Sequence, residues 1–178
     1  NDMTFTPTPE VLARMKQQYM VDLKTNTSLP QAPICNFRLT ENYQSGGAGL
    51  IGTLNDYIKF ADTLASGESA NGYRLLKPET IELMKTNQLT GASFDSFKRI
   101  VKRSGYSYAL GVRTLINQNL AHSLSPIGEF GWDGAAGAYC MIDTENKLSC
   151  YFAQHLLGCE YTFTNVHPAI RNHIYKAL

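Results

Sequence analysis

The residue pattern of the chain changes character after Arg103, and this change limits the folds that it can adopt. Up to that point, apolar residues recur at the three- and four-residue spacing of amphipathic helices. After it, residues 106–116 (YSYALGVRTLI) are rich in aromatic and β-branched side chains, as strands are. Further strands are expected over 136–143 and 147–154, which form a hairpin, and a last helix follows. This order predicts an α+β fold, an antiparallel sheet flanked by helices, without repeating βαβ units.

Capping signals place three helices ahead of Arg103. Thr8 and Pro9 predict the start of a short helix in TPEVLARMKQQY. The polar, proline-bearing residues 26–44 are then expected to form a long loop. Pro78 opens another helix in KPETIELMKTN, which follows a polar turn.

The remaining helix has the strongest pattern, in GTLNDYIKFADTLASG. Thr53 and Asp56 give it a capping-box-like start, with Asp in place of the usual Glu or Gln, and Gly67 stands where a C-terminal cap is expected. Its predicted apolar face consists of Leu50, Leu54, Tyr57, Ile58 and Leu64. In the closing helix over 168–178, the residues at helical spacing are Ile170, Ile174 and Leu178.

Length and composition narrow the possible functions. A chain of 178 residues fits one domain, and 43% hydrophobic with 17% charged residues is ordinary for a globular protein that buries a core. The formal net charge is +1 and there is no basic stripe, so a nucleic-acid partner is not expected. We also expect no membrane segment, because no apolar run is long enough to cross a bilayer. The opening NDMTFTPTPE does not have the pattern of a signal peptide.

Cysteines and histidines give no sign of a disulfide scaffold or of a zinc site. The cysteines are few and irregularly spaced: Cys35, Cys140, Cys150 and Cys159. Cys140 and Cys150 could face one another across the predicted hairpin, although reduced, packed thiols are the favoured interpretation. The histidines lack a spacing such as HExxH and are expected to be surface or hydrogen-bonded residues: His122, His155, His167 and His173. Neither a metal nor a cofactor is predicted.

One motif suggests nucleotide binding but lacks the context for it. Gly47, Gly49 and Gly52 in GAGLIG match G-x-G-x-x-G, and a predicted helix follows. The dinucleotide fingerprint also requires a buried strand that leads into the first glycine, whereas RLTENYQS is polar. We therefore interpret this segment as a glycine-rich helix entry that lies close to neighbouring backbone.

No complete catalytic constellation is present. The chain has no G-x-S-x-G elbow, and no serine stands three residues before a lysine. No tyrosine is followed two residues later by asparagine. The S-x-N match at Ser69 lies in a polar turn between predicted helices and is interpreted as chance.

Three segments in order carry a family resemblance: SGGAGLIGTLNDYIKFADTLASGE, NGYRLLKPETIELMKTNQL and GEFGWDGAAGAYCMIDTENKLSCYFAQ. Together they resemble the C-terminal half of the serine β-lactamase-like hydrolases, which include class C β-lactamases, penicillin-binding D-alanyl-D-alanine peptidases, D-aminopeptidases and esterases. The resemblance implies the C-terminal part of a β-lactamase/transpeptidase-like fold, with residues 1–178 as one portion of a single domain.

In this family a serine of a Ser-x-x-Lys motif attacks a carbonyl, and a Tyr-x-Asn tyrosine helps to move protons. Both motifs belong to the family's N-terminal half. The resemblance therefore implies a part of a serine hydrolase that is inactive as this fragment and has as partner either the missing half or a second copy. The implied substrate is a small ester, an amide or a peptide. The compartment stays open, because a leader would lie in the missing part.

The family's third motif, Lys-Thr-Gly, is matched position for position by Trp132, Asp133 and Gly134. The resemblance places these residues and Ala136 on the strand that borders the substrate, with an oxyanion-hole amide near Gly134 to Ala136. Tryptophan in place of lysine replaces a cation by a flat apolar wall, which favours neutral or cationic substrates over carboxylates. Asp133 would either add a negative charge beside this wall or point away and cap a turn.

The glycine-rich entry is a second candidate region. Tyr43, Ser45 and Gly46 are expected to border the same pocket, or else to serve only close backbone packing. A different class of function is also open: a non-catalytic binding or scaffolding descendant that kept the fold without the chemistry. An upstream Ser-x-x-Lys followed by Tyr-x-Asn would favour the enzyme.

Overall fold

The computed structural model describes residues 3–32 and 42–178. Its helices are α1 (Pro9–Arg14), α2 (Leu54–Ser66), α3 (Pro78–Lys85), α4 (Gly91–Val101), α5 (Gln118–Ala121), the π-helical turn η1 (Thr162–Val166) and α6 (His167–Lys176). Its strands are β1 (Gln18–Asp22), β2 (Thr27–Gln31), β3 (Tyr106–Tyr108), β4 (Arg113–Leu115), β5 (Phe130–Asp133), β6 (Tyr139–Asp143), β7 (Leu148–Phe152) and β8 (Leu156–Leu157).

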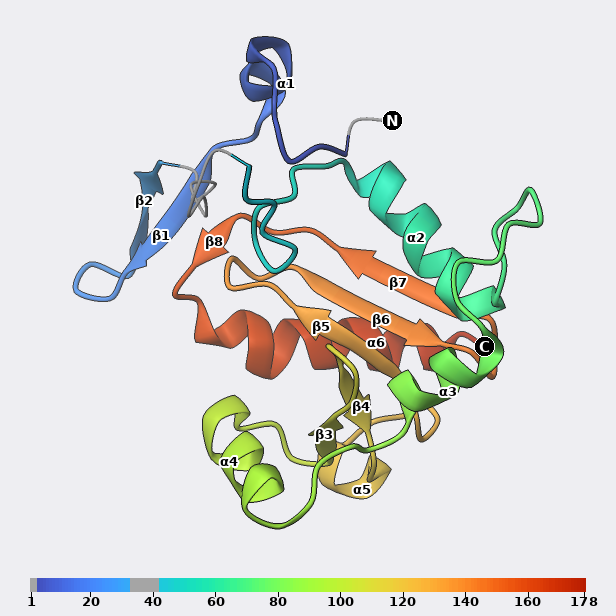
Figure 1. Ribbon diagram of the computed structural model, residues 1–178. Coiled ribbons are helices and arrows are strands. Elements are labelled where there is room, and N and C mark those ends of the chain that lie inside the picture. Colours follow the sequence, from blue (N-terminus) through green and yellow to red (C-terminus); the bar gives the residue numbers. More distant parts are fainter. Residues whose placement is uncertain (1–2, 33–41) are drawn as a thin grey trace.

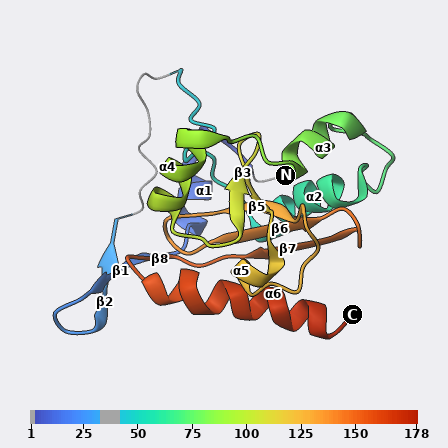
Figure 2. The same cartoon turned by 90° about the horizontal axis from the view of Figure 1, so that it is seen from below.

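A five-stranded antiparallel sheet forms the centre of the molecule, with the strand order β3-β4-β5-β6-β7. Helices α2 and α3 cover one face and α6 covers the other, so that the sheet is sandwiched between helical layers (Figures 1 and 2). The predicted α+β class and the antiparallel order of the last strands are confirmed. A separate small sheet has the order β2-β1-β8, in which β1 and β8 are parallel.

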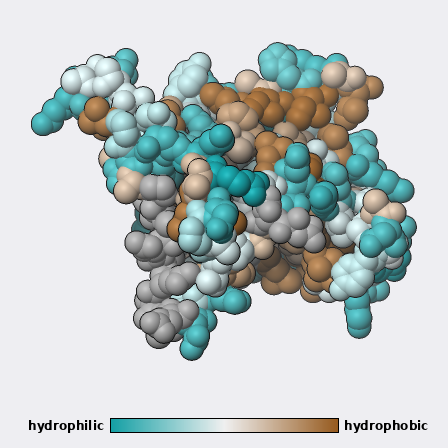
Figure 3. Space-filling view, turned by 90° about the horizontal axis from the view of Figure 1, so that it is seen from above, coloured by the Kyte–Doolittle hydropathy of each residue, from teal (hydrophilic) through white to brown (hydrophobic). Residues whose placement is uncertain are grey.

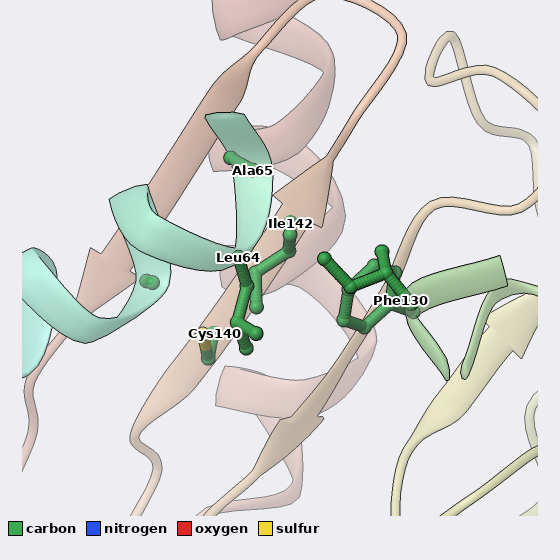
Figure 4. Packing of buried hydrophobic residues seen from close by; sticks show 7 residues of the cluster. Leu64, Ala65, Phe130, Cys140 and Ile142 are labelled. Carbon is green, nitrogen blue, oxygen red and sulfur yellow. The ribbon is translucent and has the colours of Figure 1, made fainter. Parts of the chain in front are cut away.

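Helix α2 packs its buried side against β6 and β7. Leu64 and Ala65 of α2 meet Phe130, Cys140 and Ile142 of the strands in one apolar cluster (Figure 4). The predicted ends of this helix are confirmed. Thr53 Oγ1 accepts from the amide of residue 56 and Gly67 adopts a left-handed conformation. Leu50 and Leu54 are largely exposed, so their predicted place on the buried face was wrong.

Four other predictions of secondary structure need correction. The predicted strand over 106–116 is two short strands, β3 and β4, because the chain turns back at Gly111 with φ +76°. Helix α1 ends at Arg14, and the last two residues of the predicted helical stretch, Gln18 and Tyr19, belong to β1. The predicted loop over 26–44 begins with β2, which pairs with β1. Helix α4 was not predicted at all.

Helix α6 also differs from its predicted pattern. The predicted closing helix is confirmed, but its buried residues are His167 and Arg171. Leu178 is exposed, and Ile170 and Ile174 are only partly buried. The helix therefore meets the sheet through polar side chains. None of the helices in the described residues is long and apolar enough to cross a membrane.

The described cysteines, Cys140, Cys150 and Cys159, are free thiols, as predicted. Cys35 lies outside the described residues. The sheet register places Met141 opposite Cys150, so Cys140 and Cys150 do not form a directly facing pair.

We expect Cys140 to resist alkylation. Its burial raises the pKa of the thiol to about 12, so the reactive thiolate is scarce at pH 8. Brief treatment of the folded chain with iodoacetamide at pH 8, followed by peptide mass mapping, should modify Cys159 before Cys140. The control is the same treatment of urea-unfolded chain. If folding protected Cys140 and Cys159 to the same degree, the buried position of Cys140 would be contradicted.

Candidate functional site

Trp132 lies near the end of β5 and forms part of an aromatic wall. The residue is 43% exposed, although β5 is paired on both sides. The Tyr108 ring meets the indole edge to face at 5.6 Å, and Phe97 of α4 lies 6.0 Å beyond Tyr108. A large ring that is held on one side and open on the other is suited to contact an apolar ligand.

Gly131, the residue before Trp132, allows β5 and β6 to lie close together. A Cβ at Gly131 would lie 2.0 Å from the carbonyl oxygen of Cys140 on the neighbouring strand. The two backbones can approach this closely only because position 131 has no side chain. The bare backbone here is therefore required by the close approach of β6, whereas Gly134 lies in the turn that follows.

The carboxylate of Asp133 faces inward, toward two arginines and a histidine. Arg103 Nη2 lies 2.7 Å from Oδ2 and Arg113 Nε lies 3.6 Å from the same oxygen. The Nδ1 atom of His167 lies 3.5 Å from Oδ1. Burial alone would raise the pKa of Asp133, but the His167 contact and the two guanidinium groups outweigh it and lower that pKa. Its negative charge is therefore compensated within the protein.

Arg113 is the centre of this buried polar layer, with only 1% of its side chain exposed. Its Nη1 donates to Glu129 Oε1 at 2.9 Å, and its Nη2 donates to the Cys140 carbonyl at 3.1 Å. Its guanidinium lies 5.1 Å from the ring centres of both Tyr106 and Tyr139. Burial alone would lower the pKa of Arg113, yet the nearby carboxylates hold it well above its usual value.

A tight turn connects Asp133 to β6. The amide of Gly134 donates to the Ala138 carbonyl at 2.9 Å, and the amide of Gly137 donates to the Gly134 carbonyl at 2.9 Å. The carbonyl of Ala136 accepts from the Leu156 amide at 2.9 Å. Within the described part of the chain, the amides of Ala135 and Ala136 donate to no protein group. The turn thus offers two backbone donors on a fixed framework.

The glycine-rich entry lines a groove of about 1010 Å³. Gly46 contributes to the wall of the groove. The carbonyl of Ser45 accepts a hydrogen bond from the Gly49 amide, and Tyr43 is exposed. Tyr57 and Tyr151 stack at 4.2 Å beside it. The lining of this groove includes none of the four predicted residues on the β5 side. The structure therefore keeps Trp132, Asp133, Gly134 and Ala136 together at the end of β5, whereas Gly46 lines a separate groove that Tyr43 and Ser45 do not line.

The residue pattern alone did not identify the partners of Asp133. Arg103, Arg113 and Glu129 were not singled out, and His167 was grouped with ordinary histidines. A charged residue inside an apolar strand, as in ALGVRTLI, was the available signal, because a buried charge requires a partner. No group of three or more metal-ligating side chains occurs among residues 3–32 and 42–178.

Comparison with curated proteins finds two relatives from Mycobacterium tuberculosis strains, named Uncharacterized protein MT1414 and Protein Rv1367c. Each is 28% identical to this chain over 119 residues, which are 64% of this chain and 30% of the relative. The region that matches this chain thus makes up less than a third of the length of each relative.

Solved structures share the fold. Unliganded simvastatin synthase (LovD) from Aspergillus terreus matches with a TM-score of 0.81 at 18% identity, over 99% of this chain and 46% of that one. EstCE1, described as a hydrolase with promiscuous acyltransferase activity, matches with a TM-score of 0.72 at 19% identity, over 97% of this chain and 46% of its own. At such identities the likeness concerns the fold, and it spans about half of each solved chain.

The model of one protein family covers most of the chain. The family, described as Beta-lactamase, matches residues 2–156. This range contains the glycine-rich entry, the aromatic wall and the turn after β5. The chain belongs to the beta-lactamase family.

Proposed function

We propose that this chain is the C-terminal portion of a serine acyl-transfer enzyme that hydrolyses ester or amide substrates. The observation that carries the proposal is the end of β5 in a member of this family. There a half-exposed Trp132 is followed at once by a rigid turn with unpaired backbone amides. An aromatic wall can bind the acyl group of a substrate, and backbone amide donors can stabilise the oxyanion that forms from it. The fold that the chain shares with EstCE1, which is described as a hydrolase with promiscuous acyltransferase activity, supports this reaction class.

The oxyanion donor is assigned to the amide of Ala135 or Ala136. The amide of Gly134 already donates to Ala138, so it cannot serve the substrate as well. A second donor would come from the nucleophile's own N–H in the part of the protein that carries the serine. Two backbone donors aimed at one oxygen stabilise the charge that develops in acyl transfer.

Trp132 sets the substrate class toward neutral acyl groups. It supplies an apolar surface where a cation would attract a carboxylate, and Arg103 and Arg113 already neutralise the neighbouring Asp133. A substrate carboxylate would therefore find no specific partner on this side. Small neutral esters or amides are the proposed substrates.

The substitution Trp132→Lys in the complete enzyme tests this role. It should improve hydrolysis of carboxylate-bearing β-lactams relative to neutral esters by about ten- to a hundredfold, the effect of one charge-assisted hydrogen bond in the transition state. Trp132→Met is the matched control, because it removes the ring without adding charge. Parallel changes in kcat/KM for anionic and neutral substrates would show that Trp132 does not face the substrate.

The outer edge of β7 is proposed to bind the nucleophile-bearing part of the protein or, failing that, a second copy of the chain. Within the described sheet β7 pairs only with β6, so one side of its backbone is open. All five residues of β7 are partly exposed, whereas all five of β6 are buried. Figure 3 views the molecule from the top of Figure 1, where α1, α2 and β7 lie, and shows apolar residues gathered in a band on that face. An open edge beside apolar surface favours strand pairing.

Amide exchange and solution size test this edge. On addition of the separately expressed remaining part, the amides of β7 should become protected and the particle mass should rise to that of a 1:1 complex. Without it, self-association through β7 is the expected state. A monodisperse monomer whose β7 amides already exchange slowly would count against an edge that needs a partner.

A further inference from the structure

The turn after β5 is held from behind by a buried histidine. His167 is the first residue of α6, directly after the π-helical turn η1, and only 1% of its side chain is exposed. Its Nε2 lies 3.0 Å from the Gly137 carbonyl oxygen, to which it donates. Its Nδ1 lies 3.5 Å from Asp133 Oδ1, beyond a normal hydrogen bond, and neither of these two buried atoms has a hydrogen-bond partner among the described residues. The two ring nitrogens thus face the first and last residues of the turn.

Aromatic rings keep this imidazole in one orientation. Tyr139 stacks on it at 4.8 Å, while Phe152 and Phe163 meet it edge to face at 6.1 and 5.3 Å. Rings on three sides leave the imidazole little freedom to rotate, so the direction of each nitrogen is set by packing.

The far end of the turn is confined from another side as well. A Cβ at Gly137 would lie 2.4 Å from Gln154 Oε1 and 3.2 Å from Thr162 Cγ2, and Thr162 belongs to η1. Gly137 has φ +90°, a conformation that favours glycine. Residues of η1 and α6 therefore close over the turn, and Asp133 at its near end is fixed by Arg103.

We infer that His167 is a positioning residue that clamps the turn from Asp133 to Gly137 and so fixes the backbone amides of Ala135 and Ala136. The clamp itself follows from the contacts above; its catalytic consequence rests on the proposed function. A donor fixed before the reaction needs no reorganisation when charge develops, which is how a residue that never touches the substrate affects the rate.

Two variants separate the polar contacts from the packing. His167→Phe keeps a ring between the aromatic neighbours but removes both nitrogens. His167→Gln keeps an amide donor that can reach the Gly137 carbonyl. His173→Phe is the matched control, because His173 lies on the same helix and is exposed.

Amide hydrogen exchange of the 178-residue chain is the primary measurement. Loss of the buried hydrogen bond in His167→Phe should speed exchange of the Gly134 and Gly137 amides by about tenfold or more, with the β6–β7 ladder unchanged. His167→Gln should show a smaller increase, and His173→Phe none. Unchanged exchange in the turn, or an equal increase along β6 and β7, would overturn the clamp. If His167→Phe does not fold, the exchange rates of the His167→Gln variant in the turn are compared with those along β6 and β7. Only faster exchange that is confined to the turn supports the inference.

A second measurement links the clamp to chemistry. In the complete protein, His167→Phe should lower kcat for a neutral ester by about tenfold while KM changes little, because the donors act in the transition state. An inactive wild-type protein would refute the proposed function without altering the exchange result. A fall in kcat/KM that comes only from KM would overturn the positioning role.

Discussion

The purified 178-residue chain should remain unlabelled by a serine-reactive fluorophosphonate and by a fluorescent penicillin, and it should leave a chromogenic short-chain ester intact above background. Acyl transfer needs a serine with a base within hydrogen-bond reach. No serine hydroxyl in the described residues has a lysine or histidine nitrogen as its hydrogen-bond partner. Ser149 donates to Asp62, and Ser125, which donates to Glu129, is fully buried.

The control for this prediction is the complete protein, which should be labelled at one serine and hydrolyse the same ester. The expected contrast is all or none, because removal of the nucleophile in serine hydrolases costs on the order of a millionfold in kcat. Stoichiometric labelling of a serine in the isolated chain, mapped by peptide mass, would refute the proposed division of the active site.

The second large effect concerns stability. Arg113→Ala should lower the free energy of unfolding by roughly 3–5 kcal/mol, because it leaves the buried carboxylate of Glu129 without its cation. A domain of this size is stable by only about 5–15 kcal/mol, so the variant should be close to unfolding. Urea denaturation followed by fluorescence of Trp132, the only tryptophan, measures the change.

Arg99→Ala is the matched control, since the same atoms are removed from an exposed position on α4, and it should change stability by less than about 0.5 kcal/mol. Replacing both partners, as Arg113→Met with Glu129→Leu, should recover much of the loss. A single Arg113→Ala variant within about 1 kcal/mol of wild type would contradict the central role of this ion pair.

The fold was predictable where local signals agree with the final packing. Thr53 and Gly67 bound α2 because caps are local, and the hairpin of β6 and β7 follows from alternation around a short turn. Strand β2 was missed because it is a polar edge strand that contains Pro30, and such strands lack the pattern of a buried strand. The break between β3 and β4 depends on the turn at Gly111, which an aromatic, β-branched run conceals.

The site was predictable only in part. The segment around Trp132 was found through the family resemblance, but sequence alone left open where Asp133 points. Its direction is decided by Arg103 and His167, which lie about thirty residues away on either side in the chain. Contacts of this kind arise from tertiary packing, and no local pattern encodes them.

The most direct test of the proposed active-site role is a crystal structure of the complete protein after inactivation by an alkyl phosphonate, which mimics the tetrahedral intermediate on the serine. We expect a phosphonyl oxygen to lie about 3 Å from the amide nitrogen of Ala135 or Ala136. We also expect the alkyl group to lie against the Trp132 ring. A phosphonyl oxygen bound by donors elsewhere, with residues 132–136 away from the adduct, would contradict it.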